Sequence, residues 1–148
     1  MGLLTPQDQD KLREAFGEMT RPVRLLFFTQ TIGCDTCLET RRILDELPPL
    51  SDKIAIEEVN LVLDKEKAAQ YAIDRAPALA LVYEEVQGEG DKDSRIRFLG
   101  APSGYEFVSL VQALLLVGGR ASQLTDENRQ KLAAIDKPIT MQVFTTPT

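Results

Sequence analysis

The chain has 148 residues, of which 43% are hydrophobic and 27% are charged, a composition typical of a globular protein with one main domain. Its formal net charge of -6 disfavours nucleic acid as a partner, because phosphate binding requires clustered lysine and arginine side chains. No apolar run reaches the roughly 18 to 20 residues needed to cross a bilayer, and no basic segment followed by an apolar one opens the chain. We therefore expect a cytoplasmic protein that binds neither nucleic acid nor membranes.

The chain contains two cysteines and no histidine. In a reducing compartment a close cysteine pair is more often catalytic or metal-binding than a structural disulfide. The missing histidine excludes both a cysteine–histidine catalytic pair and a zinc site of two cysteines and two histidines built from this chain alone. An all-cysteine zinc site would need two chains, and two inert buried thiols are the other alternative to redox chemistry.

The first predicted element is an amphipathic helix over Leu4–Met19, which Pro22 separates from the next element. The apolar run Val23–Phe28 predicts a central strand that is buried on both faces. A polar turn then leads to Cys34, where a second helix is predicted to begin and to continue to Leu47. A strand, a loop and a cysteine pair at a helix start therefore succeed one another directly.

A second strand is predicted over Lys53–Leu63, and a short helix over Lys65–Tyr71. The apolar parity of this strand slips between its first half, which contains Ile54, and its second half, which contains Val59. Its register therefore stays open, because a slip of one residue exchanges the two faces of a strand.

The segment after Pro77 is an apolar run that predicts a third strand ending at Tyr83, and this proline can only stand at the strand's start. Alternation over Arg95–Leu99 predicts a fourth strand with one solvated face. A last helix is predicted from about Ser103, and Gly118 ends it. The order of elements indicates an α/β fold in which helices flank a four-stranded sheet.

Residues 120–148 resemble the start of the chain. Leu124-Thr125 repeats Leu4-Thr5 at an offset of 120, and Pro138-Ile139 repeats Pro22-Val23 at an offset of 116. A chance similarity between short helix–strand segments is the alternative. We expect residues 1–119 to form one unit, and residues 120–148 to be a linker helix and the first strand of a truncated second unit.

The cysteines are three residues apart, as Cys34-Asp35-Thr36-Cys37. A helix N-terminus directs free backbone N–H groups and a partial positive charge at a nearby sulfur, which favours the reactive thiolate. On this basis Cys34 is the expected nucleophile. Cys37 is close enough to attack the resulting mixed disulfide and to resolve it.

A CxxC pair after a strand, followed 40 residues later by a proline that opens another strand, resembles the thioredoxin superfamily. The resemblance implies a thioredoxin fold, with a central mixed four-stranded sheet flanked by helices, here with an extra N-terminal helix and a C-terminal helix–strand tail. It also implies that Pro77 is cis, that Ala76 pairs with substrate, and that Gly33, Asp35 and Thr36 form the motif loop. An ordinary trans proline is the alternative for Pro77.

The whole chain is similar to the glutaredoxin-like protein disulfide oxidoreductases of thermophiles, which carry two thioredoxin-fold units. This resemblance rests on the N-terminal helix, the run Ile73–Pro77, the segment Gly100–Phe107 and the ending Thr145–Thr148. It implies a thiol-disulfide oxidoreductase that acts on protein disulfides or dithiols, has no cofactor and no metal, and accepts electrons from a thioredoxin-reductase-like donor.

Two departures from these relatives limit the resemblance. Thioredoxins have a buried aspartate six residues before the first cysteine, where this chain has Phe28. Glutaredoxins approach the proline through Thr-Val, where this chain has Arg75-Ala76, so we expect protein disulfides rather than glutathione as substrates. The alternative function is a structural or substrate-docking module whose main activity lies in a second unit.

Overall fold

The structure is a computed structural model that describes residues 2–146. Pro147 and Thr148, the last two residues of the segment Thr145–Thr148 on which part of the resemblance rests, lie outside the described residues. The elements are α1 (Pro6–Phe16), β1 (Val23–Thr29), α2 (Cys37–Asp45), a short 3-10 helix η1 (Pro48–Leu50), β2 (Ile54–Asn60), α3 (Lys65–Gln70), β3 (Ala78–Tyr83), β4 (Lys92–Leu99), α4 (Tyr105–Val117) and α5 (Asp126–Ala133). Apart from η1, which was not predicted, the order from α1 to α4 is the one predicted from the sequence.

The four strands form one mixed sheet in the order β2-β1-β3-β4. Strand β1 pairs in parallel with β2, and the pairs β1–β3 and β3–β4 are antiparallel. The parallel pair is possible because α2 and η1 carry the chain back between β1 and β2. The predicted fold class, a thioredoxin fold with a central mixed sheet flanked by helices, is confirmed.

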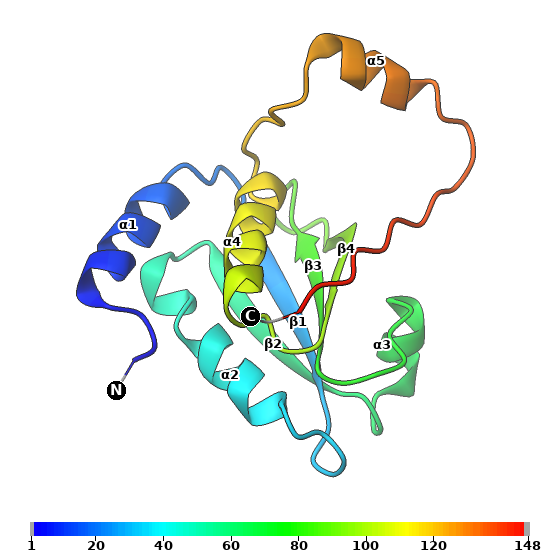
Figure 1. Ribbon diagram of the computed structural model, residues 1–148. Coiled ribbons are helices and arrows are strands. Elements are labelled where there is room, and N and C mark those ends of the chain that lie inside the picture. Colours follow the sequence, from blue (N-terminus) through cyan, green and yellow to red (C-terminus); the bar gives the residue numbers. More distant parts are fainter. Residues whose placement is uncertain (1, 147–148) are drawn as a thin grey trace.

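Strand β1 is buried on both faces because alternate side chains enter two different apolar cores. Val23, Leu25 and Phe27 lie in the larger core with residues of α1, α2 and α4. Leu26 and Phe28 lie on the opposite face with residues of α3 and its flanks. In Figure 1 helices α2 and α4 accordingly cover one side of the sheet, and α3 lies on the other.

The slip in apolar parity along β2 has the same cause. Ile54 belongs to the larger core, whereas Val59 belongs to the core beside α3. Both faces of the sheet are covered, so this edge strand contributes apolar side chains first to one face and then to the other. The register is regular throughout, from Val23 opposite Ile54 to Thr29 opposite Asn60.

Two predicted helix boundaries are wrong. Helix α1 ends at Phe16 with Gly17 as its C-cap, so Met19, which was assigned to the helix, is buried in the segment that leads to β1. Helix α2 begins at Cys37 with Thr36 as its N-cap, so Cys34 precedes the helix rather than starting it. A turn at positions 35 and 36 separates Cys34 from the helix.

Strand β4 begins at Lys92, earlier than predicted, and contains an irregularity. Its pairing with β3 shifts between Ala80 and Val82, and Arg95 has a positive φ of 65° at this point. The Ser94 hydroxyl donates a hydrogen bond to the Leu81 carbonyl at 2.6 Å. The extra residues on β4 between the partners of Ala80 and Val82 form a β-bulge.

Residues 121–146 are exposed along their whole described length. Helix α5 stands apart from the sheet in Figure 1, with one irregular segment connecting it to α4 and another following it. Beyond Ala133 the described tail, up to residue 146, contains no strand. The second unit expected from the internal similarity therefore stays a prediction.

Candidate functional site: the Cys34–Cys37 disulfide

Cys34 and Cys37 form a disulfide, and their Cα atoms are 5.5 Å apart. The two cysteines differ in exposure. Cys37 lies in the first turn of α2 and is 7% exposed, whereas Cys34 lies in the preceding loop and is half-buried. Cys34 is therefore the more accessible of the two cysteines.

The loop before the helix is shaped by local contacts. Gly33 has a positive φ of 74°, a conformation that glycine adopts at little cost, and its carbonyl accepts a hydrogen bond from the Gln30 amide at 3.1 Å. The Thr36 carbonyl accepts bonds from the Thr40 backbone N–H at 2.9 Å and from the Thr40 hydroxyl at 2.8 Å. Thr40 is fully buried, so it fixes the first turn that carries Cys37.

The bond between Ala76 and Pro77 is cis, as the resemblance implied. Pro77 is buried directly before β3, and its carbonyl accepts a hydrogen bond from the Gly100 N–H at 2.9 Å. Ala76 is half-buried, and among residues 2–146 its backbone N–H and carbonyl have no hydrogen-bond partner. A backbone unit without hydrogen-bond partners, such as this one, can pair with an extended peptide.

Three loops meet at this end of the sheet. Ala78 pairs with Phe28 near the end of β1, so Pro77 lies beside the point where the cysteine loop leaves the sheet. Gly100 joins the same corner through its bond to Pro77 and leads into the loop before α4. The structure therefore brings the two predicted site segments to one corner of the fold.

Phe28 occupies the position at which thioredoxins have a buried carboxylate. Its side chain is fully buried, in a core whose members are apolar or aromatic. The Phe28 ring packs against Tyr71, with ring centroids 6.3 Å apart. Burial raises the pKa of Tyr71, so its phenol stays protonated and neutral across the physiological range.

The charged pair beside the cis proline lies at the surface. Arg75 donates two hydrogen bonds to the Asp74 carboxylate, at 2.8 and 3.3 Å. The hydrogen bond from Arg75 lowers the pKa of Asp74. Both side chains are largely exposed, so the pair contributes little to stability.

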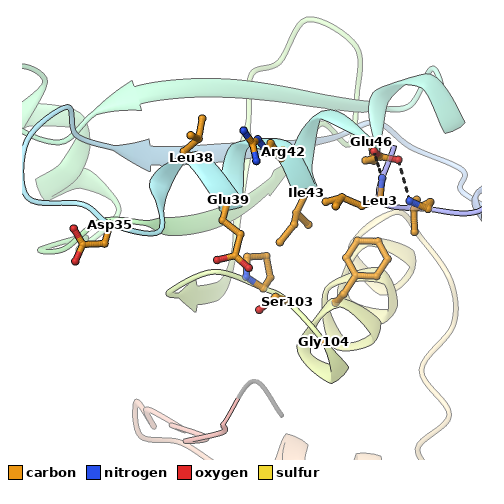
Figure 2. A pocket seen from close by; sticks show the side chains of 12 residues that line it. Leu3, Asp35, Leu38, Glu39, Arg42, Ile43, Glu46, Ser103 and Gly104 are labelled. Atoms are coloured by element: carbon orange, nitrogen blue, oxygen red, sulfur yellow. Dashed lines mark hydrogen bonds between the residues drawn. The ribbon is translucent and has the colours of Figure 1, made fainter. Parts of the chain in front are cut away.

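A cavity of about 550 Å³ adjoins the cysteine loop and was not predicted from the sequence. It begins at Asp35, between the cysteines, and runs along α2 past Leu38 and Glu39 to Glu46. Figure 2 shows Glu39 and Ile43 extending from α2 toward the loop that contains Ser103 and Gly104. One sequence signal points to this face: Leu38 is apolar yet lies off the buried stripe of α2, and it is 64% exposed.

No helix among residues 2–146 is long and apolar enough to cross a membrane. The same residues contain no group of three or more Cys, Asp or Glu side chains placed to hold a metal ion.

No protein-family model matches the chain. The F subunit of alkyl hydroperoxide reductase from Xanthomonas campestris pv. phaseoli is 34% identical over 112 residues, which are 74% of this chain and 17% of that protein. A probable thioredoxin from Methanothermobacter thermautotrophicus is 29% identical over 53% of this chain and 80% of its own length. The chain spans between 10% and 24% of the length of the curated NADH dehydrogenase and alkyl hydroperoxide reductase relatives that it matches.

Two solved structures have the same arrangement over most of the chain. The N-terminal NTD_N/C domain of the alkyl hydroperoxide reductase AhpF from Enterococcus faecalis has a TM-score of 0.79 and 27% identity, covering 90% of this chain and 62% of that one. A protein disulfide oxidoreductase from Aeropyrum pernix K1 has a TM-score of 0.72 and 23% identity, covering 88% of this chain and 54% of that one.

The chain therefore combines a thioredoxin fold with a CxxC disulfide at one corner of it, and it shares this fold with the N-terminal domain of AhpF. The more specific resemblance predicted from the sequence, to the two-unit protein disulfide oxidoreductases, is confirmed in the fold shared with the Aeropyrum pernix protein. The resemblance to the N-terminal domain of AhpF was not foreseen from the sequence.

Proposed function

We propose that the chain exchanges electrons with protein disulfides and dithiols, with Cys34 as the nucleophile and Cys37 as the resolving cysteine. The observation that carries this assignment is the difference in exposure within the disulfide, because Cys34 is half-buried and Cys37 is only 7% exposed. A thiol that must meet a protein substrate needs access, whereas a resolving thiol only has to reach its neighbour.

Each step of the reaction breaks one S–S bond and forms another, so bonds and electrons balance. In the reductive direction the Cys34 thiolate attacks a substrate disulfide, forms a mixed disulfide and releases one substrate thiolate. The Cys37 thiolate then attacks the Cys34 sulfur and releases the second substrate thiolate. The product is the Cys34–Cys37 disulfide present in this structure, and two electrons have passed to the substrate.

The backbone of Ala76 is proposed to hold the substrate during this exchange. Its N–H and carbonyl have no partner among residues 2–146, and Pro77 presents them at the corner from which the cysteine loop leaves the sheet. A substrate strand that pairs here places its own sulfur beside the loop Gly33–Thr36. The recognition is independent of side chains, which suits an enzyme with many protein substrates.

Cysteine variants test the assignment. Cys34→Ser should abolish the reduction of insulin by dithiothreitol that the wild-type chain catalyses, and it should form no covalent adduct. Cys37→Ser should also stop turnover, but it should accumulate a mixed disulfide with the substrate, visible by mass spectrometry. An adduct formed by Cys34→Ser instead would reverse the roles, and a wild-type rate equal to that of Cys34→Ser would favour a docking module.

The return of electrons requires a second partner. We propose an external dithiol or a reductase of the thioredoxin-reductase type as donor, and the cytoplasm as the compartment in which the pair cycles. Relatives named as the F subunit of alkyl hydroperoxide reductase support a partner of the reductase class. Reduction of the disulfide by a purified flavin reductase and NAD(P)H, followed as loss of absorbance at the nicotinamide band, tests this choice.

We further propose that residues 1–119 form one unit and that residues 120–148 are the linker helix and the first strand of a second unit. Residues 1–119 make up roughly four fifths of the chain, so the 90% coverage by the Enterococcus faecalis domain includes part of the tail. The exposed apolar side chains of Ile139, Met141 and Phe144 support this proposal, because a strand of a second unit would bury such side chains in its own core. The structure of a longer protein that contains this chain should show them inside a second core.

A further inference from the structure

The cavity beside the disulfide is a groove along one face of α2. Its residues on that side are Asp35, Leu38, Glu39, Arg42, Ile43 and Glu46, which recur at the three- and four-residue spacing of a helix face. At 1.5 Å per residue this face is about 16 Å long. An extended polypeptide of about five residues has the same length.

The opposite walls of the groove are apolar. Pro102 and Phe107 form the wall that comes from α4 and the loop before it, and Leu3 and Leu4 form a third wall. Glu46 holds this N-terminal segment in place, because its carboxylate accepts the backbone N–H of Leu3 at 2.7 Å and that of Leu4 at 3.4 Å. Figure 2 shows both hydrogen bonds at the end of the groove far from Asp35.

Charge is distributed unevenly along the groove. Asp35 and Glu39 lie at the end nearest the cysteines, and among residues 2–146 neither carboxylate has a hydrogen bond or an ion pair. Arg42, which also lines the groove, lies further along α2. The groove is therefore negative beside the disulfide and apolar along its walls, with its positive charge displaced from the redox centre.

We propose that this groove binds the segment of a protein substrate that flanks its reactive cysteine, and that it selects a lysine or arginine next to the cysteine followed by a large apolar side chain. The basic side chain would meet Asp35 and Glu39, and the apolar one would enter between Leu38 and Phe107. The proposal rests on the function proposed above and adds a sequence preference to it. Pairing with Ala76 alone would give no such preference, because it involves only the backbone.

Three symmetric peptides test the preference, each carrying its cysteine as a mixed disulfide with 5-thio-2-nitrobenzoate: Leu-Lys-Cys-Lys-Leu, Leu-Glu-Cys-Glu-Leu and Ser-Lys-Cys-Lys-Ser. The reduced protein displaces thionitrobenzoate from each peptide in a single turnover and is itself oxidised to the disulfide, and the release of the coloured thiolate reports the second-order rate constant. The symmetric flanks make the direction of binding irrelevant. The Lys–Leu peptide should react at least about tenfold faster than either of the others.

Matched variants locate the preference. Glu39→Lys should remove the advantage of the Lys–Leu peptide over the Glu–Leu peptide, and Leu38→Ser should remove its advantage over the Lys–Ser peptide. The controls Glu66→Lys and Leu63→Ser make the same changes at exposed positions outside the groove and should keep both ratios. Equal rates for the three peptides, or ratios that none of the groove variants changes, would overturn the proposal.

A measurement without chemistry separates this proposal from the proposed function. The peptide Leu-Lys-Ser-Lys-Leu cannot exchange disulfides, so its binding to the oxidised chain can be followed by amide chemical shifts alone. Shifts at Leu3, Leu38 and Ile43 are expected, and they should weaken with Glu39→Lys. If millimolar peptide causes no chemical-shift changes at these residues, the proposal that the groove binds substrate is wrong. If the peptide causes these changes but the protein reduces no disulfide, only the proposed function is wrong.

Discussion

Phe28 lies near the end of β1, where its ring is fully buried and packs against Tyr71. Its neighbours in this core are apolar or aromatic, so residue 28 supplies no carboxylate that could take the proton of a buried thiol. In the proposed exchange, the proton that Cys37 loses before it resolves a mixed disulfide therefore does not pass to residue 28. At this position the residue contributes to the stability of the fold rather than to proton transfer.

Replacing Phe28 by alanine should therefore destabilise the protein without a specific effect on chemistry. A buried phenylalanine truncated to alanine typically costs about 3 to 5 kcal/mol, because transfer energy is lost and a cavity is left. Urea unfolding followed by circular dichroism measures this cost. Tyr105→Ala is the matched control, since Tyr105 is 81% exposed and its loss should change stability by less than about 0.5 kcal/mol.

At the scale of elements, the end of α4 is fastened to the segment before β1. The Thr20 backbone N–H donates to the Gly118 carbonyl at 2.8 Å, and the Arg21 guanidinium donates to the Val117 carbonyl at 2.7 Å. Gly119 has a φ of 108°, and a Cβ placed there would overlap the Thr20 hydroxyl oxygen. The absence of a side chain at Gly119 thus permits the close approach of Thr20 to the end of α4.

Gly119→Ala should destabilise the protein clearly more than the same substitution at another glycine that has a similarly positive φ. Gly90 provides the comparison, because its φ is 89° and a Cβ there would meet nothing within 4 Å. Strain alone costs on the order of 1 kcal/mol or somewhat more in both variants. Equal losses of thermal stability in Gly119→Ala and Gly90→Ala would show that the contact with Thr20 does not matter.

The bulge in β4 holds an ion pair whose contribution depends on pH. Arg97 donates to the Asp93 carboxylate at 2.7 and 2.8 Å, and this hydrogen bonding lowers the pKa of Asp93. A lowered pKa in the folded state means that the stabilisation is complete above the unfolded pKa of about 3.9 and is lost as the pH falls through the folded pKa. The Arg97 guanidinium also donates to the Tyr71 carbonyl at 3.0 Å, which orients it.

Asp93→Asn should accordingly be less stable than the wild type at pH 7, by up to about 1 kcal/mol because the pair is partly exposed. The difference should shrink below about pH 4, where the wild-type carboxylate also becomes protonated. Urea midpoints of both proteins at pH 7 and pH 3 provide the measurement. A difference that is the same at both pH values would mean that the pair does not stabilise the fold.

The strands and the redox motif could be predicted because each depends on neighbours in sequence. Val23–Phe28 is apolar in an unbroken run, and the spacing of Cys34 and Cys37 is visible directly. The start of α2 was misplaced because the turn after Cys34 delays the helix, and no side chain caps it to mark the boundary. The bulge at Arg95 and the groove were not predicted, since both are assembled from segments that are distant in the sequence.

At the scale of the whole molecule, the described chain consists of a packed body and an exposed tail. Residues 121–146 bury no side chain. Even the apolar side chains of Met141, Val143 and Phe144 are between 80% and 90% exposed. Apolar side chains exposed in a run are a site for association rather than a source of stability. The free energy of folding of this chain therefore comes from the residues before position 121.

Removal of residues 122–148 should leave the stability of the body within about 0.5 kcal/mol of the full chain, because no core contact is lost. Rates of insulin reduction should also be unchanged. The truncated protein should associate less at high concentration, as measured by light scattering. A loss of several kcal/mol on truncation would mean that the tail packs on the body in solution.

The contact between the end of α4 and the segment before β1 also sets which parts of the protein open together. Amide hydrogens exchange with solvent only when their local structure opens, and elements tied by shared hydrogen bonds open as one unit. The amide of Thr20, bonded to Gly118, should exchange as slowly as those in the centre of β1. The amides of α5 should exchange orders of magnitude faster, so deuterium uptake alone would separate the body that carries the redox centre from the tail.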